Sequence, residues 1–449
     1  MLPLLFNVLQ TIAVEDRTEV RARAVDSELV ADVETDPRAQ YKAEWKNGLD
    51  AFSLYYGPRI VFTNFTGTEP AAGVDNDVRQ LDYLHRGGGA LQLRLAPLTS
   101  VALTGNVTYG KASLGTILIQ PRWNGEDRPA APLPFPQIGP RRLEVLSSFS
   151  SANVFHQVSP RLWIQPGFVF VTYGAPTFEG QKVQPYLENP ALRFELNYSM
   201  SPRDDFNFEI QPQVNLFTST QEIPEFDASG KAKDPEVDAQ GNRVKPATFE
   251  SRTAPPLYQT YAEARFKHHF SELVSAELSG GTSFTVQDRS ILKEDLYNVK
   301  RNPTQIETQV YPIAEVAFIA GFRPSTGTRG RFYGYSRLNP WLSSLTGEVL
   351  RRVDNVLALS ITAGRNTFRA QGAVAITLPN ELQPYRQVTG ELGYERRVSP
   401  EFSLDVGARI GYQVADLPNF AKGGVLEEVS TVQPGGYVGI AYRPLPLKL

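Results

Sequence analysis

Four histidines are the residues that could act as general bases or metal ligands in this sequence: His85, His156, His268 and His269. A base that activates a nucleophile needs that nucleophile and an orienting acid beside it, and no spacing in the chain indicates such a set. The neighbours His268 and His269 would point to opposite faces of a strand, which disfavours a shared metal. We therefore expect ordinary interfacial or inward-facing histidines, with no catalytic residue, no bound metal and no cofactor.

Other chemical motifs are missing from the sequence. The chain has no cysteine, which excludes disulfides, thiolate zinc sites and a cysteine nucleophile. It has no phosphate-binding glycine loop, zinc-helix motif or calcium loop. Gly87-Gly88-Gly89 indicates a bend or close packing. With 45 basic and 48 acidic residues, the charge gives no reason to expect a nucleic-acid partner.

The clearest pattern is an alternation of apolar and polar residues with a period of two. It runs through 192–200, 206–216, 274–286 and 402–414, and it is typical of a strand whose two faces meet different environments. Soluble strands usually have about 5–6 residues, whereas these runs have about 10–13, the length that a tilted strand needs to cross a bilayer. The pattern favours an all-β protein, a transmembrane antiparallel up-and-down β-barrel of about 16–18 strands, over a large soluble β protein.

Short and long connections between the predicted strands alternate, as expected for such a barrel. Short turns are predicted at 46–48, 96–98, 159–161, 201–203, 270–272, 352–354 and 399–401, and longer polar connections at 64–82, 111–141, 174–190, 219–256, 287–307 and 415–432. The eighteen predicted strands are 19–33, 38–46, 49–63, 83–95, 99–110, 142–158, 161–173, 191–201, 205–218, 257–270, 273–287, 308–322, 331–340, 345–352, 355–376, 386–398, 401–414 and 434–444. Merging strands within 331–376 would give sixteen.

The domain organisation is simple. Residues 1–13 are apolar and end in a small residue, so they are interpreted as a signal segment that lacks a positively charged start. Residues 14–449 form one barrel domain with long extracellular loops near 111–141 and 219–256. The proline-bearing 111–141 loop is stiff and could cap the mouth of the barrel. The charged 219–256 loop is expected outside the barrel, with inward folding as the alternative.

From residue 14 onward, the architecture resembles Gram-negative outer-membrane porin-like β-barrels, and more faintly the barrels of polysaccharide-secretion machinery. The resemblance implies an outer-membrane location. It implies outer-membrane lipid and the assembly machinery as partners, and periplasmic export components in the polysaccharide alternative. One feature departs from the family: Arg443-Pro444 and a further tail follow the aromatic Tyr442.

The polar faces of the predicted strands supply candidate pore-lining residues. A barrel of this size leaves an aqueous lumen unless something plugs it, so we expect a channel for hydrophilic solutes without strong ion selectivity. Alternatively, these charges pair along the wall and only stabilise it. Other hypotheses are a conduit for secreted polysaccharide, an outer-membrane hydrolase, and a structural or adhesive barrel. The candidates are Arg94, Arg193, Glu195, Glu209, Gln211, Glu263, Arg265, Lys267, Glu277, Glu391, Glu395, Asp405 and Arg409.

Overall fold

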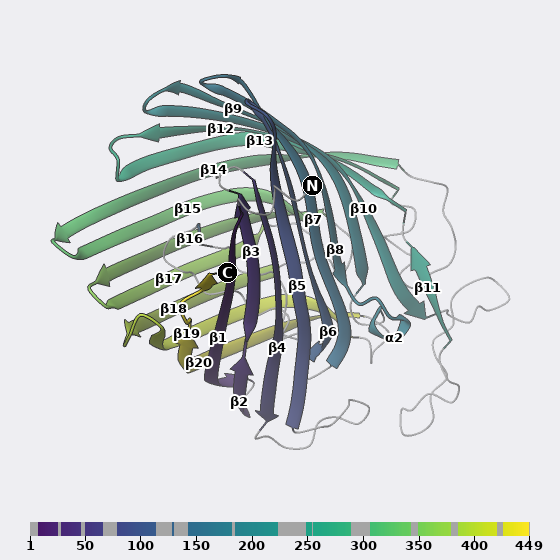
Figure 1. The fold of residues 1–449 in the computed structure, drawn as a ribbon. Helices are drawn as coiled ribbons and strands as arrows, with labels where there is room; N and C mark the ends of the chain where they lie inside the picture. Colours follow the sequence, from purple (N-terminus) through teal and green to yellow (C-terminus); the bar gives the residue numbers. More distant parts are fainter. Residues whose placement is uncertain are drawn as a thin grey trace, which may run out of the picture.

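The chain forms a single antiparallel sheet that closes on itself (Figure 1). The computed structural model describes residues 8–25, 28–45, 50–65, 79–113, 128–129, 142–181, 185–222, 248–253, 255–288, 306–342, 349–378, 385–419 and 425–448. Within these ranges the only helix is α2 (Phe178–Gln181), and none of the described residues belongs to a helix with the length and apolar character needed to cross a membrane.

Long strands make up almost all of the described chain. The first half holds β1 (Val8–Val25), β2 (Glu28–Thr35), β3 (Arg38–Trp45), β4 (Ala51–Phe65), β5 (Arg79–Ala96), β6 (Thr99–Ser113), β7 (Arg142–Ser159), β8 (Leu162–Gly174), β9 (Tyr186–Ser201) and β10 (Asp204–Glu222). The second half holds β11 (Phe249–Thr253), β12 (Leu257–His269), β13 (Val274–Asp288), β14 (Ile306–Ser325), β15 (Thr328–Leu342), β16 (Val349–Ala363), β17 (Asn366–Thr377), β18 (Tyr385–Arg397), β19 (Phe402–Asn419), β20 (Val425–Tyr442) and β21 (Leu447–Lys448).

The pairing shows that the barrel has 18 strand positions. The register between β1 and β20 closes the sheet. Of the 21 strands, β2 and β3 share one position between β1 and β4, β11 and β12 share one beside β10, and β21 pairs with β1 beyond the end of β20. Subtracting these three extra segments from 21 leaves 18. The predicted fold class is confirmed.

Asp36-Pro37 interrupts the position shared by β2 and β3. Proline has no N–H to donate to a sheet ladder, so it breaks a strand at this point. The Asp36 N–H still donates to the Arg17 carbonyl at 2.9 Å, which keeps the two segments aligned beside β1. Residues 28–45 therefore run from one rim of the barrel to the other in a single strand position, although they contain two strands.

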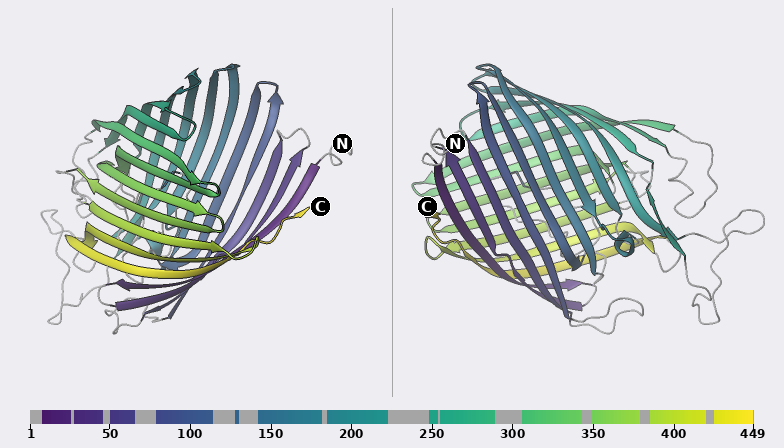
Figure 2. Two further views of the ribbon diagram at one scale, coloured as in Figure 1. Left: turned by 90° about the vertical axis from the view of Figure 1, so that its left-hand side faces the viewer. Right: turned by 45° about the vertical axis from the view of Figure 1, so that its right-hand side comes forward.

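The two rims of the barrel differ in how the strands are joined (Figure 2). At one rim, hairpins close through short turns, including 97–98, 160–161, 202–203, 326–327 and 364–365. β1 begins and β20 ends at this short-turn rim. At the other rim the connections are mostly longer, and α2 lies in one of them. The predicted alternation of short and long connections is confirmed.

Two stretches of the predicted strand map are wrong. The strand predicted at 19–33 is the end of β1 followed by β2, and residues 8–13, assigned above to a signal segment, lie in β1 and pair with β3. The predicted turn at 352–354 lies inside β16, and the strand predicted at 355–376 is the end of β16, the turn at 364–365 and β17. Two charged residues so close together are typical of a turn, which is why a turn was predicted at 352–354. Instead, Arg352 and Asp354 share one face of β16 and form an ion pair at 2.5 Å. The strand count was unaffected because each error moved boundaries without changing the number of strands.

Candidate functional site

The two faces of each barrel strand have opposite surroundings. On β16, Val356 is 1% exposed and its neighbour Leu357 is 60% exposed, and on β14 Glu315 is 1% exposed while Val316 is 58% exposed. Large exposed apolar side chains repeat at alternate positions on strand after strand, for example Leu392, Ile410 and Val438. An apolar outer face around a closed sheet is what a lipid bilayer requires, because the closed ladder leaves no backbone edge unpaired. The chain is a transmembrane β-barrel.

No family model matches the chain, and no curated protein matches its sequence. Among solved structures, it is similar to the copper transporter OprC at 10% identity and a TM-score of 0.46, covering 96% of this chain and 80% of that one. It is also similar to Pseudomonas aeruginosa OccK7 at 10% identity and a TM-score of 0.45, covering 98% and 99%. Acinetobacter baumannii OccAB1 gives 10% identity, a TM-score of 0.43, and 97% coverage of both chains. These similarities assign no role to any residue of this chain, so the role of each inward-facing group is derived from its own contacts.

An ion-pair network lies on the inward face where the barrel closes. Asp405 of β19 binds Arg17 of β1 at 2.8 Å and Arg369 of β17 at 3.5 Å. The strand between β19 and β1 is β20, and its Gly439 pairs with Glu19 on one side and with Asp405 on the other. Because Gly439 has no side chain, Arg17 can reach across β20 to Asp405. The network thus joins β19 to β1 over the closing strand.

The same network continues along β1, β2 and β4. The guanidinium of Arg21 lies 2.5 Å from carboxylate oxygens of both Glu19 and Glu34, and Arg59 donates to Glu34 at 2.7 Å. Glu19 and Glu34 are 3% and 7% exposed, so both carboxylates are largely removed from water. Buried carboxylates need such partners. These pairs are made along the wall, between neighbouring strands.

A second network, called here the Glu315 cluster, consists of Arg128, Glu263, Glu315 and Arg337. Arg337 of β15 binds Glu263 of β12 at 3.1 Å and Glu315 of β14 at 3.2 Å. The side chain of Glu315 has no exposed area and also accepts a 2.7 Å hydrogen bond from Arg128. Glu315 therefore holds two guanidinium groups.

Arg128 is the unusual member of this cluster because it lies in the connection between β6 and β7. Its guanidinium carbon lies 4.2 Å from the ring centroid of Tyr335, on the wall formed by β14 and β15. In the order around the barrel, these strands are far from β6 and β7, so Arg128 binds a part of the wall that does not adjoin the two strands its connection joins. Burial lowers the pKa of Arg128, but the hydrogen bond and charge of Glu315 outweigh burial and raise it above the ordinary value.

The platform under Arg128 is an inward-facing apolar cluster. Ala317, Tyr333, Tyr335, Val356 and Ala373 pack together from β14 to β17. Such a cluster is unusual for a face that otherwise carries polar groups, and it gives the Arg128 guanidinium an aromatic surface on which to lie. The contact places a positive charge from a connection against the inward wall.

The structure places the other predicted pore-lining residues on the inward face, mostly in pairs. Arg193 binds Glu209 at 2.8 Å and Glu195 at 2.9 Å, Arg265 binds Glu277 at 3.0 Å, and Arg409 binds Glu391 at 2.8 Å. Glu395 binds Arg369 at 3.0 Å, and Gln211 donates to Gln213 at 3.0 Å. Lys267 shares the inward face of β12 with Glu263 and Arg265. Which of these residues touches a passing solute stays a prediction.

Arg94 has a different position from the rest of the predicted set. Its side chain donates to the carbonyls of Ala96 at 3.2 Å and Pro97 at 2.6 Å. It therefore caps the turn between β5 and β6 at the short-turn rim. This local contact gives Arg94 a structural role in the turn.

Each histidine has a simple local partner. His85 bonds the Tyr56 hydroxyl at 2.8 Å, and His156 bonds the Thr99 hydroxyl at 2.9 Å. His268 and His269 bond separate carboxylates, Asp204 at 2.7 Å and Asp205 at 3.2 Å. In the described ranges no group of three or more His, Cys, Asp or Glu residues could hold a metal ion.

Sequence reasoning missed several charged residues of these networks. Arg17, Glu19 and Arg21 alternate in the sequence, but the boundary predicted at residue 19 divided them. Glu315 and Arg337 fall in correctly predicted strands and could have been found from their place in the alternation. Arg128 has no such signal because it lies in a connection. Apart from residues 111–113, 128–129, 219–222, 248–253 and 255–256, both loops singled out above lie outside the described residues.

Proposed function

We propose that this protein is an outer-membrane channel through which hydrophilic solutes pass along a polar lumen. The observation that carries the proposal is the combination of an apolar outer face with an inward face of paired charges in a barrel of 18 positions. The interior of a barrel of about 8 strands is filled by its own side chains, whereas a barrel of about 16–18 strands leaves an aqueous channel. Arg128 lies in that channel as part of a connection, and it belongs to no helix or strand.

The partners follow from the same proposal. Outer-membrane lipid would contact the exposed apolar positions. The assembly machinery would read the end of β20, where Tyr442 lies 4.6 Å from Phe402 between ring centroids. We propose no catalytic role for this barrel. No feature of the described residues favours polysaccharide as the cargo over small solutes.

Planar-bilayer recording of the purified protein tests the channel. We expect stable steps of current, and a larger step for Arg128→Ala by up to about twofold, because removing a side chain that lies against the inward wall changes the charge and the free cross-section of the lumen. The matched control is Arg161→Ala, since Arg161 donates to the Met200 carbonyl at the rim at 3.4 Å and lies away from Glu315. Absence of current at any voltage from the folded, inserted protein would contradict the proposal.

A further inference from the structure

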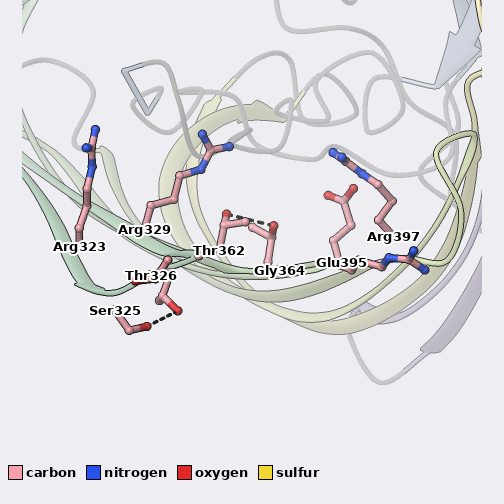
Figure 3. A pocket seen from close by; sticks show the side chains of 12 residues that line it. Arg323, Ser325, Thr326, Arg329, Thr362, Gly364, Glu395 and Arg397 are labelled. Atoms are coloured by element: carbon pink, nitrogen blue, oxygen red, sulfur yellow. Dashed lines mark hydrogen bonds between the residues drawn. The ribbon is translucent and has the colours of Figure 1, made fainter.

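A pocket of about 520 Å³ lies at the short-turn rim, where the hairpin turns β14–β15, β16–β17 and β18–β19 come together. Four of its lining residues, Arg323, Arg329, Arg365 and Arg397, are arginines, and they are called here the arginine rim. Figure 3 shows the side chains of Arg323, Arg329 and Arg397 projecting from the sheet on one side. By their place in the strand alternation, Arg329 and Arg397 point into the lumen.

Most donors of the arginine rim are unused. Arg323, Arg329 and Arg397 are exposed, and the guanidinium group of none of them donates to an acceptor in the part of the chain that the structure describes. Arg365 uses one nitrogen, which donates to the Val398 carbonyl at 3.2 Å. By contrast, the guanidinium of Arg94, elsewhere on the same rim, donates to two carbonyls of a turn. The arginine rim therefore has hydrogen-bonding capacity that turn capping does not explain.

The charge of the pocket is strongly positive. Its lining contains one carboxylate, Glu395, against four guanidinium groups. Glu395 is itself bound to Arg369 at 3.0 Å, which is not a lining residue. The pocket therefore keeps most of its positive charge.

Hydroxyl groups and a braced backbone complete the pocket. Gly327 and Gly364 adopt left-handed conformations, with φ of 86° and 57°, and the Gly364 N–H donates to the Gly327 carbonyl at 3.2 Å. This bond ties two adjacent turns together. Ser325 donates to Thr328 at 2.9 Å, and Thr362 and Thr367 share a 3.2 Å bond. The arginines thus rise from turns whose geometry is fixed before a ligand arrives.

We propose that the arginine rim binds the oxyanion groups, phosphate or carboxylate, of a free solute that enters the lumen from the short-turn side. A guanidinium offers a planar fork that matches two oxygens of such a group, and this pairing is stronger than one between neutral groups. The pocket volume falls in the range of small-molecule sites, about 300–1,000 Å³. Its position inside the mouth favours a solute over a lipid headgroup. The inference gives the proposed channel its substrate class and rests on that function.

Block of the channel current by inorganic pyrophosphate tests the site. The test variant is the triple substitution R323Q/R329Q/R397Q, recorded in neutral-lipid bilayers with pyrophosphate added to each side in turn. We expect wild-type current to be blocked from one side more than from the other, and the half-blocking concentration to rise by about tenfold or more in the variant. The matched control is R161Q/R203Q/R443Q, which removes the same charge from three other positions at the same rim: two turns and the residue after β20. Its half-blocking concentration should stay close to that of wild type.

An equal rise in both triple variants would mean general electrostatic attraction and would overturn the site, as would a wild-type channel that pyrophosphate does not block. Calorimetric titration of the detergent-solubilised barrel with pyrophosphate separates this result from failure of the channel itself. Binding that the arginine-rim variant loses and the control keeps supports the site even if no current is seen. No binding by the folded wild-type barrel overturns it.

Discussion

The Glu315 cluster and the arginine rim use the same side chain for different purposes. In the cluster, two arginines converge on one buried carboxylate, at 2.7 and 3.2 Å, and the charges neutralise one another. On the rim, the pocket lining contains four arginines and a single carboxylate, which is paired with Arg369 outside the lining. An inward-facing arginine thus braces the wall where a neighbouring strand presents a carboxylate, and keeps its donors unused where none does.

The largest effect on stability is expected from Glu315→Ala. The substitution leaves Arg128 and Arg337 facing each other without their shared partner, and breaking a buried pair costs about 3–5 kcal/mol. Because both guanidiniums are partly exposed, we expect a loss of about 3 kcal/mol in the free energy of unfolding. Urea unfolding in lipid vesicles, followed by tryptophan fluorescence, measures it. Glu315→Gln, which keeps an oxygen acceptor, should lose less free energy of unfolding. An alanine variant that unfolds at the same urea concentration as wild type would contradict the stabilising role of Glu315.

A smaller loss is expected from Asp405→Asn at the barrel closure. Asparagine keeps one oxygen for Arg17 or Arg369 but loses the charge, so the expected cost is about 1.5–2 kcal/mol, the lower part of the range for a hydrogen bond to a charged group. Glu401→Gln in the neighbouring turn is the matched control. If the two variants unfold at the same urea concentration, the link across β20 contributes nothing to closure.

The smallest effect is expected from Arg397→Gln on the arginine rim. This side chain is exposed and has no described acceptor, so its loss should leave the unfolding midpoint unchanged. The same urea titration checks it, beside Arg369→Gln, which breaks the bonds to Glu395 and Asp405 and should unfold earlier. A destabilised Arg397→Gln variant would show that the rim also braces the wall, and the contrast between the two regions would disappear.

The sequence predicted those features that depend on local alternation. Leu404 and Asp405 could be assigned to opposite faces because neighbouring side chains of a strand point apart, and this assignment is independent of which strand lies alongside. Ion-pair partners could not be predicted, since Arg17 meets Asp405 only through the register of β1, β20 and β19. The role of Arg128 could not be predicted for another reason. A residue in a connection has no periodic signal, and its partner Glu315 lies 187 positions away in the sequence.

Boundaries failed where charge resembled a turn. Arg352 and Asp354 are two inward-facing residues of β16 that read as a polar break, whereas Gly364 marks the real turn through its left-handed backbone. A charged pair spaced by two positions within a strand is thus as consistent with a paired inner wall as with a loop.

The central claim is that each strand separates lipid from water, and β19 offers the most direct test. The chain has no cysteine, so single cysteines can be placed at each position from Phe402 to Gly411 and spin-labelled in lipid vesicles. We predict that collision with oxygen, which concentrates in lipid, and with a water-soluble nickel complex will alternate in opposite phase with a period of two. Labels at Leu404, Val406 and Ile410 should meet oxygen, and those at Arg409 and Gly411, which have room on the inward face, should meet nickel. Uniform access of the nickel complex to all positions would contradict the account.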